Sequence, residues 1–261
     1  MTAEFRDAVV VSDLHLWNPD EPRYRAALRF LREVPREVDL VVVLGDLFDF
    51  WIAANERLAE RFRDVIAELA ALRARGATVL YCEGNHDLYL EPHFRDVMGL
   101  DTFVGERLVR VAGRAVSLSH GDLVNPHDRG YLFLRWLLRT PLVRWLERVA
   151  PAALAVAIGE RASRKSRGFT ARKNDPIVEL SHAYATERIA LGADVVVIGH
   201  THRAERTELA AVGGRKGLYL NTGYWPPDGR ATWARINATG VHLYELAPPG
   251  PLAPPAPWSK S

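Results

Sequence analysis

Five short, mostly apolar runs rich in β-branched residues recur along the chain. They span residues 8–12, 40–44, 78–82, 115–119 and 194–198. Runs of this length that are apolar on both faces are typical of strands in a sheet that is covered on both sides. The chain is therefore expected to fold around buried strands with other layers packed against them.

A helix is predicted between the second and third runs, because apolar residues recur there at steps of four and three. The stripe consists of Leu58, Phe62, Val65, Leu69 and Leu72. Gly76 follows it where a helix C-cap belongs. Strand, helix and strand in this order favour a layered α/β fold. Three further strands joined by short turns are predicted at 216–221, 231–236 and 241–246.

Composition excludes several classes of protein. The 261 residues are 48% hydrophobic and 25% charged, with a formal net charge of +2, so nothing in the global charge indicates a nucleic-acid partner. The single cysteine, Cys82, excludes a disulfide framework. A strand-like run begins within seven residues of Met1, and no stretch of about 18 uncharged apolar residues follows. We therefore expect a cytoplasmic protein without a signal peptide.

Two segments differ from the rest. Residues 123–175 carry 11 Lys and Arg against four Asp and Glu, together with many Leu, Phe and Trp residues. They are expected to form a helical, basic and apolar lid inserted into a core made of 1–122 and 176–246. Residues 247–261 hold six of the 16 prolines and should form a loose tail.

A polar motif follows each of the five apolar runs. The motifs are Asp13-Leu-His15, Gly45-Asp46-Leu-Phe-Asp49, Gly84-Asn85-His86-Asp87, His120-Gly-Asp122 and Gly199-His200-Thr-His202. In open α/β sheets the site lies beyond the carboxyl ends of the strands, so these side chains are expected to converge. Taken alone, Asp13 could be a helix cap and His120 a core histidine, but neither alternative explains five motifs in series.

The residue types indicate a metal site. Asp, Asn and His without cysteine suit Mn²⁺, Fe²⁺ or Zn²⁺. Seven protein ligands are too many for one ion that must keep a position open, but they suit two ions that share a carboxylate. Two such ions can clamp the attacking and leaving oxygens of a displacement at phosphorus. The pattern therefore favours phosphoester hydrolysis.

The order of the five motifs over residues 13–202 resembles the calcineurin-like metallophosphoesterases. The resemblance implies an α/β fold in which a β-sandwich is flanked by helices and carries a helical lid insertion. It also implies that one ion is held by Asp13, His15, Asp46 and His202. The other would be held by Asp46, Asn85, His120 and His200, with manganese as the preferred metal and Asp46 as the bridge.

The same resemblance implies roles for the remaining motif residues. His86 is not a ligand in the family pattern and is expected to act in catalysis, by a hydrogen bond or proton to a phosphoryl or leaving oxygen. Asp87 is also predicted to be a catalytic residue. Asp49 and Asp122, and Asp87 in a second reading, are expected to orient histidines or water. His93, His127, His182 and His242 are interpreted as packing or surface residues.

The insertion resembles that of the UDP-2,3-diacylglucosamine hydrolases, pyrophosphatases of lipid A synthesis. This resemblance implies substrate contacts from Asn85, His86, Asp128, Tyr131, Arg164, Ser166, Arg167, Lys173 and His200. At position 86 the chain departs from well-known members, which carry arginine there. A UDP-linked diacyl sugar needs cations for its phosphates and an apolar trough for its chains, and the insertion carries both kinds of residue.

The lid also suggests a second partner. Its net charge of +7 and its Trp and Leu residues predict peripheral attachment to an anionic membrane surface, on the cytoplasmic face of the inner membrane. No oligomeric state is predicted. Two alternatives remain: a phosphatase or phosphodiesterase for a soluble nucleotide or phosphoprotein, and a non-catalytic scaffold. The seven intact ligand positions argue against the scaffold.

Overall fold

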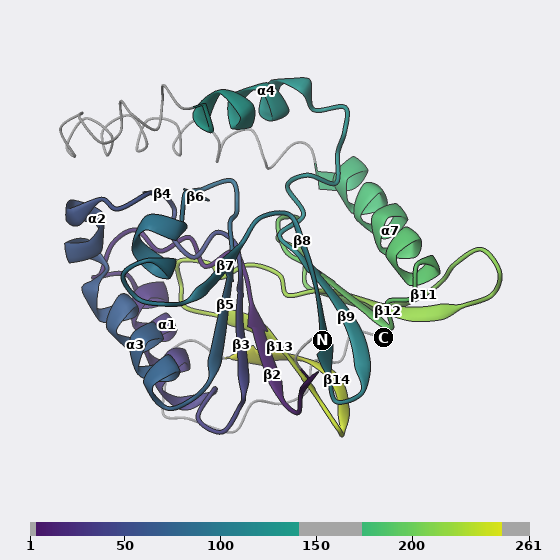
Figure 1. The fold of residues 1–261 in the computed structure, drawn as a ribbon, viewed down its shortest axis with the longest axis horizontal. Coiled ribbons are helices and arrows are strands. Elements are labelled where there is room, and N and C mark those ends of the chain that lie inside the picture. The colour runs from purple at the N-terminus through teal and green to yellow at the C-terminus, as the bar shows by residue number, and fades with distance from the viewer. Residues whose placement is uncertain (1–3, 141–173, 247–261) are drawn as a thin grey trace.

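The fold is that of a computed structural model, which describes residues 4–140 and 174–246. The described residues form two large β-sheets packed face to face, with helices on both outer sides (Figure 1). The predicted fold class, a β-sandwich flanked by helices, is confirmed. The predicted lid is described only from residue 123 to residue 140 and again from residue 174.

The first sheet has six strands among the described residues, and parallel pairing dominates its centre. In spatial order they are β14 (Gly240–Leu246), β13 (Ala231–Asn237), β2 (Ala8–Val11), β3 (Leu40–Leu44), β5 (Thr78–Cys82) and β7 (Asp101–Phe103). β2, β3, β5 and β7 are parallel, whereas β13 is antiparallel to both β2 and β14. Val41 of β3 is opposite Val9 of β2 on one side and Val79 of β5 on the other.

The second sheet also has six strands in the described part of the chain. In spatial order they are β1 (Glu4–Phe5), β8 (Glu106–Val111), β9 (Arg114–Ser119), β10 (Val195–Ile198), β12 (Lys216–Asn221) and β11 (Glu205–Ala210). β9, β10 and β12 are parallel, and β8 and β11 flank them in antiparallel pairs. A small separate sheet pairs β4 (Trp51–Ile52) with β6 (Asp87–Leu88).

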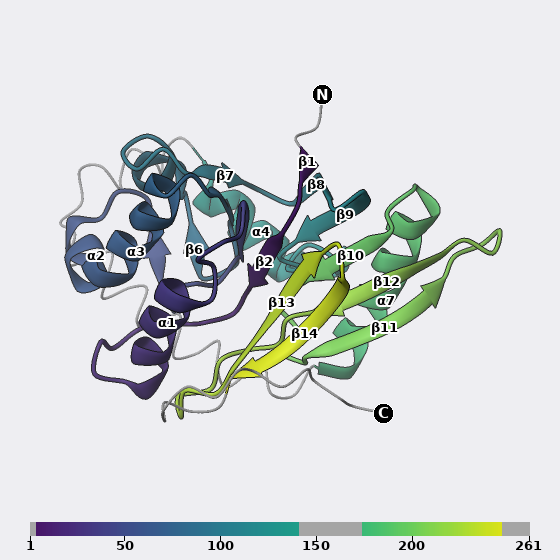
Figure 2. The ribbon, with the colours of Figure 1, turned by 90° about the horizontal axis from the view of Figure 1, so that it is seen from below.

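Helices cover the outer faces of the sandwich. The described helices are α1 (Pro22–Glu33), α2 (Glu56–Arg61), α3 (Arg63–Ala74), the short π-helix η1 (Glu91–Arg95), α4 (Arg129–Leu138) and α7 (Asn174–Ala190), of which α4 lies at the top of the molecule in Figure 1. α1 and α3 lie on the outer side of the first sheet and α7 on the outer side of the second, as the view from below also shows (Figure 2).

Alternate residues of each central strand face different layers. Val9 and Val41 pack with the residues of α1 and α3, whereas Val10 and Val42 pack against the second sheet, where they meet residues such as Val197. Because both faces are buried, each strand is apolar throughout, as predicted.

The structure corrects two expectations. The five apolar runs do not share one sheet: three lie in the first sheet and two in the second. The stripe from Leu58 to Leu72 is buried, but it belongs to two helices because Phe62 leaves helical geometry between α2 and α3 and stacks on Phe48. Gly76 follows α3 with a φ of 93°, as the predicted C-cap requires.

Several elements were not predicted, among them α1, β8, β11 and α7. β11 alternates between half-buried and exposed residues and is rich in charge, so no apolar run marks it. Within the described ranges, no helix combines the length and apolar character needed to cross a bilayer.

Candidate metal centre

The loops that follow β2, β3, β5, β9 and β10 meet at the seam between the two sheets. Direct hydrogen bonds join them across this seam. The backbone N–H of His200 donates to Asp13 Oδ2 at 2.9 Å, and His120 Nδ1 donates to the Leu44 carbonyl at 2.9 Å. Loops that follow strands of the first sheet are therefore hydrogen-bonded to loops that follow strands of the second sheet. All seven predicted ligand residues lie in these loops.

The backbone is strained at most of the predicted ligands. Five of them adopt a positive φ: Asp13 (54°), His15 (46°), Asp46 (54°), His200 (64°) and His202 (59°). Residues other than glycine rarely adopt this conformation, and each instance costs on the order of 1–3 kcal/mol. Such strain persists where the surrounding structure fixes it, and it commonly marks a functional site.

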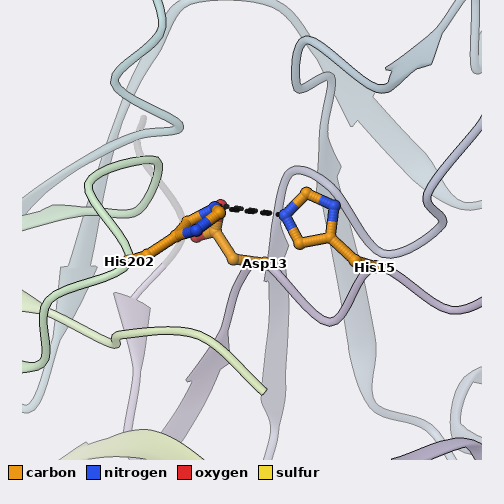
Figure 3. Close-up of side chains that lie close together, drawn as sticks. All are labelled: Asp13, His15 and His202. Carbon is orange, nitrogen blue, oxygen red and sulfur yellow. Dashed lines mark hydrogen bonds and ion pairs between the residues drawn. The ribbon is translucent and has the colours of Figure 1, made fainter. Parts of the chain in front are cut away.

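One half of the centre is formed by Asp13, His15 and His202, which point toward one another (Figure 3). The Nε2 atoms of the two histidines are 3.1 Å apart. Asp13 Oδ1 lies 3.3 Å from His202 Nε2 and 3.9 Å from His15 Nε2. Three ligand atoms thus surround a space that one cation could fill.

The other half is formed around Asp46 and His120. Asp46 Oδ2 lies 3.5 Å from His120 Nε2 and 3.8 Å from His15 Nε2, so a single carboxylate oxygen faces both halves. Asn85 Oδ1 lies 3.1 Å from His120 Nε2. Asp46 Oδ2 thus lies where a ligand shared by two ions would lie.

His200 lies beside this second half. Its ring centroid is 5.2 Å from that of His120, in an edge-to-face arrangement. Burial and the neighbouring charge of His120 lower the pKa of His200 to about 4. A neutral imidazole is the form that binds a metal.

The charges of the centre are strongly coupled. Burial alone would raise the pKa of Asp46, but the facing His120, His86 and His15 hold it well below its ordinary value. Burial would likewise lower the pKa of His120, but the Asp46 carboxylate outweighs it and raises that pKa well above its ordinary value. The Asp46 carboxylate and the His120 imidazole thus favour each other's charged form at this position.

The residues present fit divalent cations. Asp13 Oδ1 is buried and has no hydrogen-bond partner among the described residues, which is costly unless a cation or water satisfies it. The donors are carboxylate, amide and imidazole groups, and Cys82 is buried within β5. Mn²⁺, Fe²⁺ and Zn²⁺ all accept such a set.

His86 lies at the edge of the centre and is oriented by Asp49. Its Nδ1–H donates to the Asp49 carbonyl at 2.8 Å, and its ring centroid is 4.8 Å from that of His15. Asp49 Oδ1 is also 3.6 Å from His15 Nδ1. Asp49 thus contacts both histidines on the side away from their Nε2 atoms, and its role as an orienting residue remains a prediction.

Asp87 is buried behind the centre. Its carboxylate accepts hydrogen bonds from the backbone N–H groups of Asp46, Leu47 and Gly84 and from the hydroxyl of Tyr81. Burial, followed by the charge of Asp46, raises its pKa to about 8. These contacts suit a group that fixes the Asp46 and Asn85 loops. Its placement in the catalytic set remains a prediction.

The predicted substrate contacts on α4 already have partners within the chain. Asp128 caps the helix by accepting from the backbone N–H of Tyr131 at 3.0 Å, and the Tyr131 hydroxyl donates to Asp122. Asp122 also accepts a hydrogen bond from Arg135, and its role in orienting histidines or water remains a prediction. Arg164, Ser166, Arg167 and Lys173 lie outside the described residues, so their roles remain predictions.

Gly84 shows why glycines recur in the motifs. A Cβ atom at this position would meet the Asp46 carboxylate and lie 2.7 Å from the Asp46 backbone nitrogen. Only glycine lets the loop after β5 approach the bridging residue this closely.

Sequence reasoning missed several residues that support the centre. The ring of Tyr224 stacks on His202, with centroids 5.0 Å apart and an interplanar angle of 15°. Ser12 Oγ is 2.7 Å from Thr222 Oγ1 and donates to Asp13. Tyr224 and Thr222 follow β12, which ends in no metal-binding motif, so no local signal identifies them.

Comparisons with known proteins agree with this geometry. The family model described as "Calcineurin-like phosphoesterase" matches residues 8–204. A UDP-2,3-diacylglucosamine hydrolase of Azotobacter vinelandii is 30% identical over 90% of this chain and 96% of its own length. Proteins of the same name are 29% identical in Edwardsiella ictaluri, over 90% of both chains, and 33% identical in Aeromonas salmonicida, over 74% of this chain and 76% of the relative.

Proposed function

The chain belongs to the calcineurin-like phosphoesterase family of metal-dependent hydrolases, and from this premise we propose that it cleaves the pyrophosphate of UDP-2,3-diacylglucosamine. The products would be UMP and 2,3-diacylglucosamine 1-phosphate. The observation that carries the chemistry is the Asp46 carboxylate, whose Oδ2 faces His15 at 3.8 Å and His120 at 3.5 Å. The names and coverage of the relatives support the substrate.

The chain offers ligands for two ions. Asp13, His15, Asp46 and His202 would hold one, and Asp46, Asn85, His120 and His200 the other. When bound, a pair of divalent ions polarises the phosphoryl oxygens and activates water near neutral pH. We propose manganese as the preferred metal, because hard carboxylate and amide oxygens share the site with imidazoles.

The protein's own groups then orient the substrate. Because Nδ1–H of His86 is committed to the Asp49 carbonyl, only its Nε2 can face a phosphoryl or leaving oxygen. His86 would thus present one ring nitrogen to the place where negative charge accumulates during cleavage.

The exposed face of α4 supports a substrate with acyl chains and a membrane location. Four of its large apolar side chains are solvent-exposed, namely Phe133 (61%), Leu134 (50%), Trp136 (61%) and Leu137 (40%). The rings of Phe133 and Trp136 lie against each other, with centroids 5.7 Å apart. We propose that this face contacts acyl chains and an anionic membrane surface, on the cytoplasmic face of the inner membrane.

The test is to incubate the protein with UDP-2,3-diacylglucosamine and Mn²⁺ and to identify the products by mass spectrometry. UMP and the diacyl sugar 1-phosphate are expected. Reaction in H₂¹⁸O should place the label in one product only, which identifies the phosphorus that is attacked. Release of UDP, or turnover of soluble phosphomonoesters or nucleotides without cleavage of this substrate, would contradict the proposal and favour a different phosphoester.

A further inference from the structure

Two arginines on one side of α4 contact the loops of the metal centre. Arg135 and Arg139 are separated by one helical turn, and α4 lies at the top of the molecule in Figure 1. Arg135 is the one residue of α4 that is buried, at 7% exposure. A buried guanidinium requires charged or polar partners.

Arg135 binds the loops that carry His120 and Asn85. Its Nη1 donates to Asp122 Oδ2 at 2.6 Å and to the Gly84 carbonyl at 3.4 Å. Asp122 follows His120 by two residues, and Gly84 directly precedes Asn85. One guanidinium nitrogen thus contacts two of the loops that supply ligands to the second half of the centre, those that carry Asn85 and His120.

Arg139, one turn later, also contacts the loop that carries Asn85. It forms an ion pair with Glu83, which immediately precedes Gly84. Glu83 is 1% exposed, and Asp122 is 6% exposed. For these two buried carboxylates, Arg135 and Arg139 supply the ion pairs found among the described residues. Breaking a buried pair by removing one partner leaves an uncompensated charge, which forces the surrounding loop to rearrange.

We propose that Arg135 is a positioning residue, which makes the His120–Asn85 half of the metal centre depend on the seating of α4. The inference rests on the proposed two-ion centre. When α4 is in place, its guanidinium neutralises Asp122 and fixes the two loops. When Arg135 is lost, Asp122 turns toward water and carries the His120 loop with it. The half formed by Asp13, His15 and His202 uses other loops and keeps its geometry.

The test is manganese binding by the full chain, measured by equilibrium dialysis and calorimetry. Wild type should bind two ions. Arg135→Met should keep one ion at unchanged affinity and bind the second at least 10-fold more weakly. The double variant Arg135→Met/Asp122→Asn, which removes both charges, should recover most of the second affinity. A role in overall stability alone would not weaken one ion selectively.

A control variant and two possible contrary results distinguish the role of Arg135 from the existence of the two-ion centre. Arg188→Met removes a comparable arginine, whose pair with Glu106 (2.9 Å) lies in another part of the fold, and should bind two ions normally. If Arg135→Met does not fold, Arg135→Lys and the double variant provide the same comparison. Wild-type binding of two ions with no selective loss in the Arg135 variants overturns this inference alone. Failure of wild type to bind two ions overturns the proposed centre as well.

Discussion

Single residues of the centre are held in conformations that an isolated chain would avoid. Asp13, Asp46 and His202 all have a positive φ, and each imposes a cost on folding. The hydrogen bonds from Ser12 to Asp13 and from His86 N–H to Asp46 Oδ1 restrain two of these carboxylates. The free carboxylate oxygens therefore face the ligand histidines, and metal binding offsets part of this strain.

Replacing Asp46 by alanine should abolish binding of both ions and essentially all activity. Asp46 Oδ2 faces His15 and His120, so its loss removes a shared ligand and the charge that screens the two ions. Metal content by elemental analysis and turnover by mass spectrometry provide the measurements. Asp228→Ala, which removes an exposed aspartate paired with Arg230, is the control. Two retained equivalents of metal would rule out Asp46 as the bridge.

Replacing His86 by alanine should lower kcat by about 10²–10⁴ while both ions stay bound. The His86 side chain donates to the Asp49 carbonyl and is not among the predicted ligands, so its loss leaves the ligand set intact. His242→Ala, a change on β14, should leave kcat unchanged. An unaltered kcat for the His86 variant would remove this residue from the mechanism.

Secondary-structure elements bring these residues together in two ways. The strands end at the seam between the sheets, so the ligand loops that follow them lie there, and close backbone packing sets the distances between these loops. α4 adds a second layer, because its inner side contacts the loops through Arg135 and Arg139 while its outer side exposes Phe133 and Trp136. Binding of a ligand or membrane to the outer side of α4 can thus affect the positions of the metal-ligand loops on its inner side.

Replacing Gly84 by alanine should lower metal affinity and activity together. The added methyl would collide with the carboxylate and backbone of Asp46, so the loop after β5 must move away. Gly130→Ala is the matched control, because a Cβ there would meet only Asp128 Oδ1, at 3.7 Å. Calorimetry with Mn²⁺ compares the two variants, and equal affinities would show that the loop tolerates the methyl group.

The double variant Phe133→Ser/Trp136→Ser should bind anionic vesicles more weakly, or show a higher KM for the diacyl substrate, with hydrolysis of a soluble phosphodiester nearly unchanged. Burial of a large apolar side chain contributes about 1.5–3 kcal/mol, so two losses should be measurable. Leu191→Ser/Val212→Ser removes exposed apolar residues elsewhere and serves as the control. Equal behaviour of both variants in vesicle sedimentation and kinetics would exclude the α4 face.

At the scale of the whole molecule, the centre lies between two sheets whose facing sides share a core of buried apolar residues. Asp13 and Asp46 follow strands of the first sheet, whereas His120 and His202 follow strands of the second. Ions bound between them would link the two layers. Metal binding should therefore stabilise the whole fold and not one loop.

Removal of metal by a chelator should lower Tm, and added Mn²⁺ should restore it. An ion at 100 times its Kd contributes about 2.7 kcal/mol, which corresponds to a shift of roughly 5–10 °C for a domain of this size. Scanning calorimetry of the full chain measures this shift, and Asp46→Ala should not respond to Mn²⁺. Equal Tm values for wild type with and without metal would contradict binding across the seam.

From the sequence alone came the central strands, the order of the motifs and the candidate ligand residues. Apolar runs and metal-binding side chains are local properties, so Val9, Val41 and the Asp13–His15 pair could be identified without coordinates. Three features became visible only in three dimensions: the runs divide between two sheets, Tyr224 stacks on His202, and Arg135 pairs with Asp122. These features depend on pairing between segments distant along the chain, where burial and geometry, rather than local pattern, select the partner.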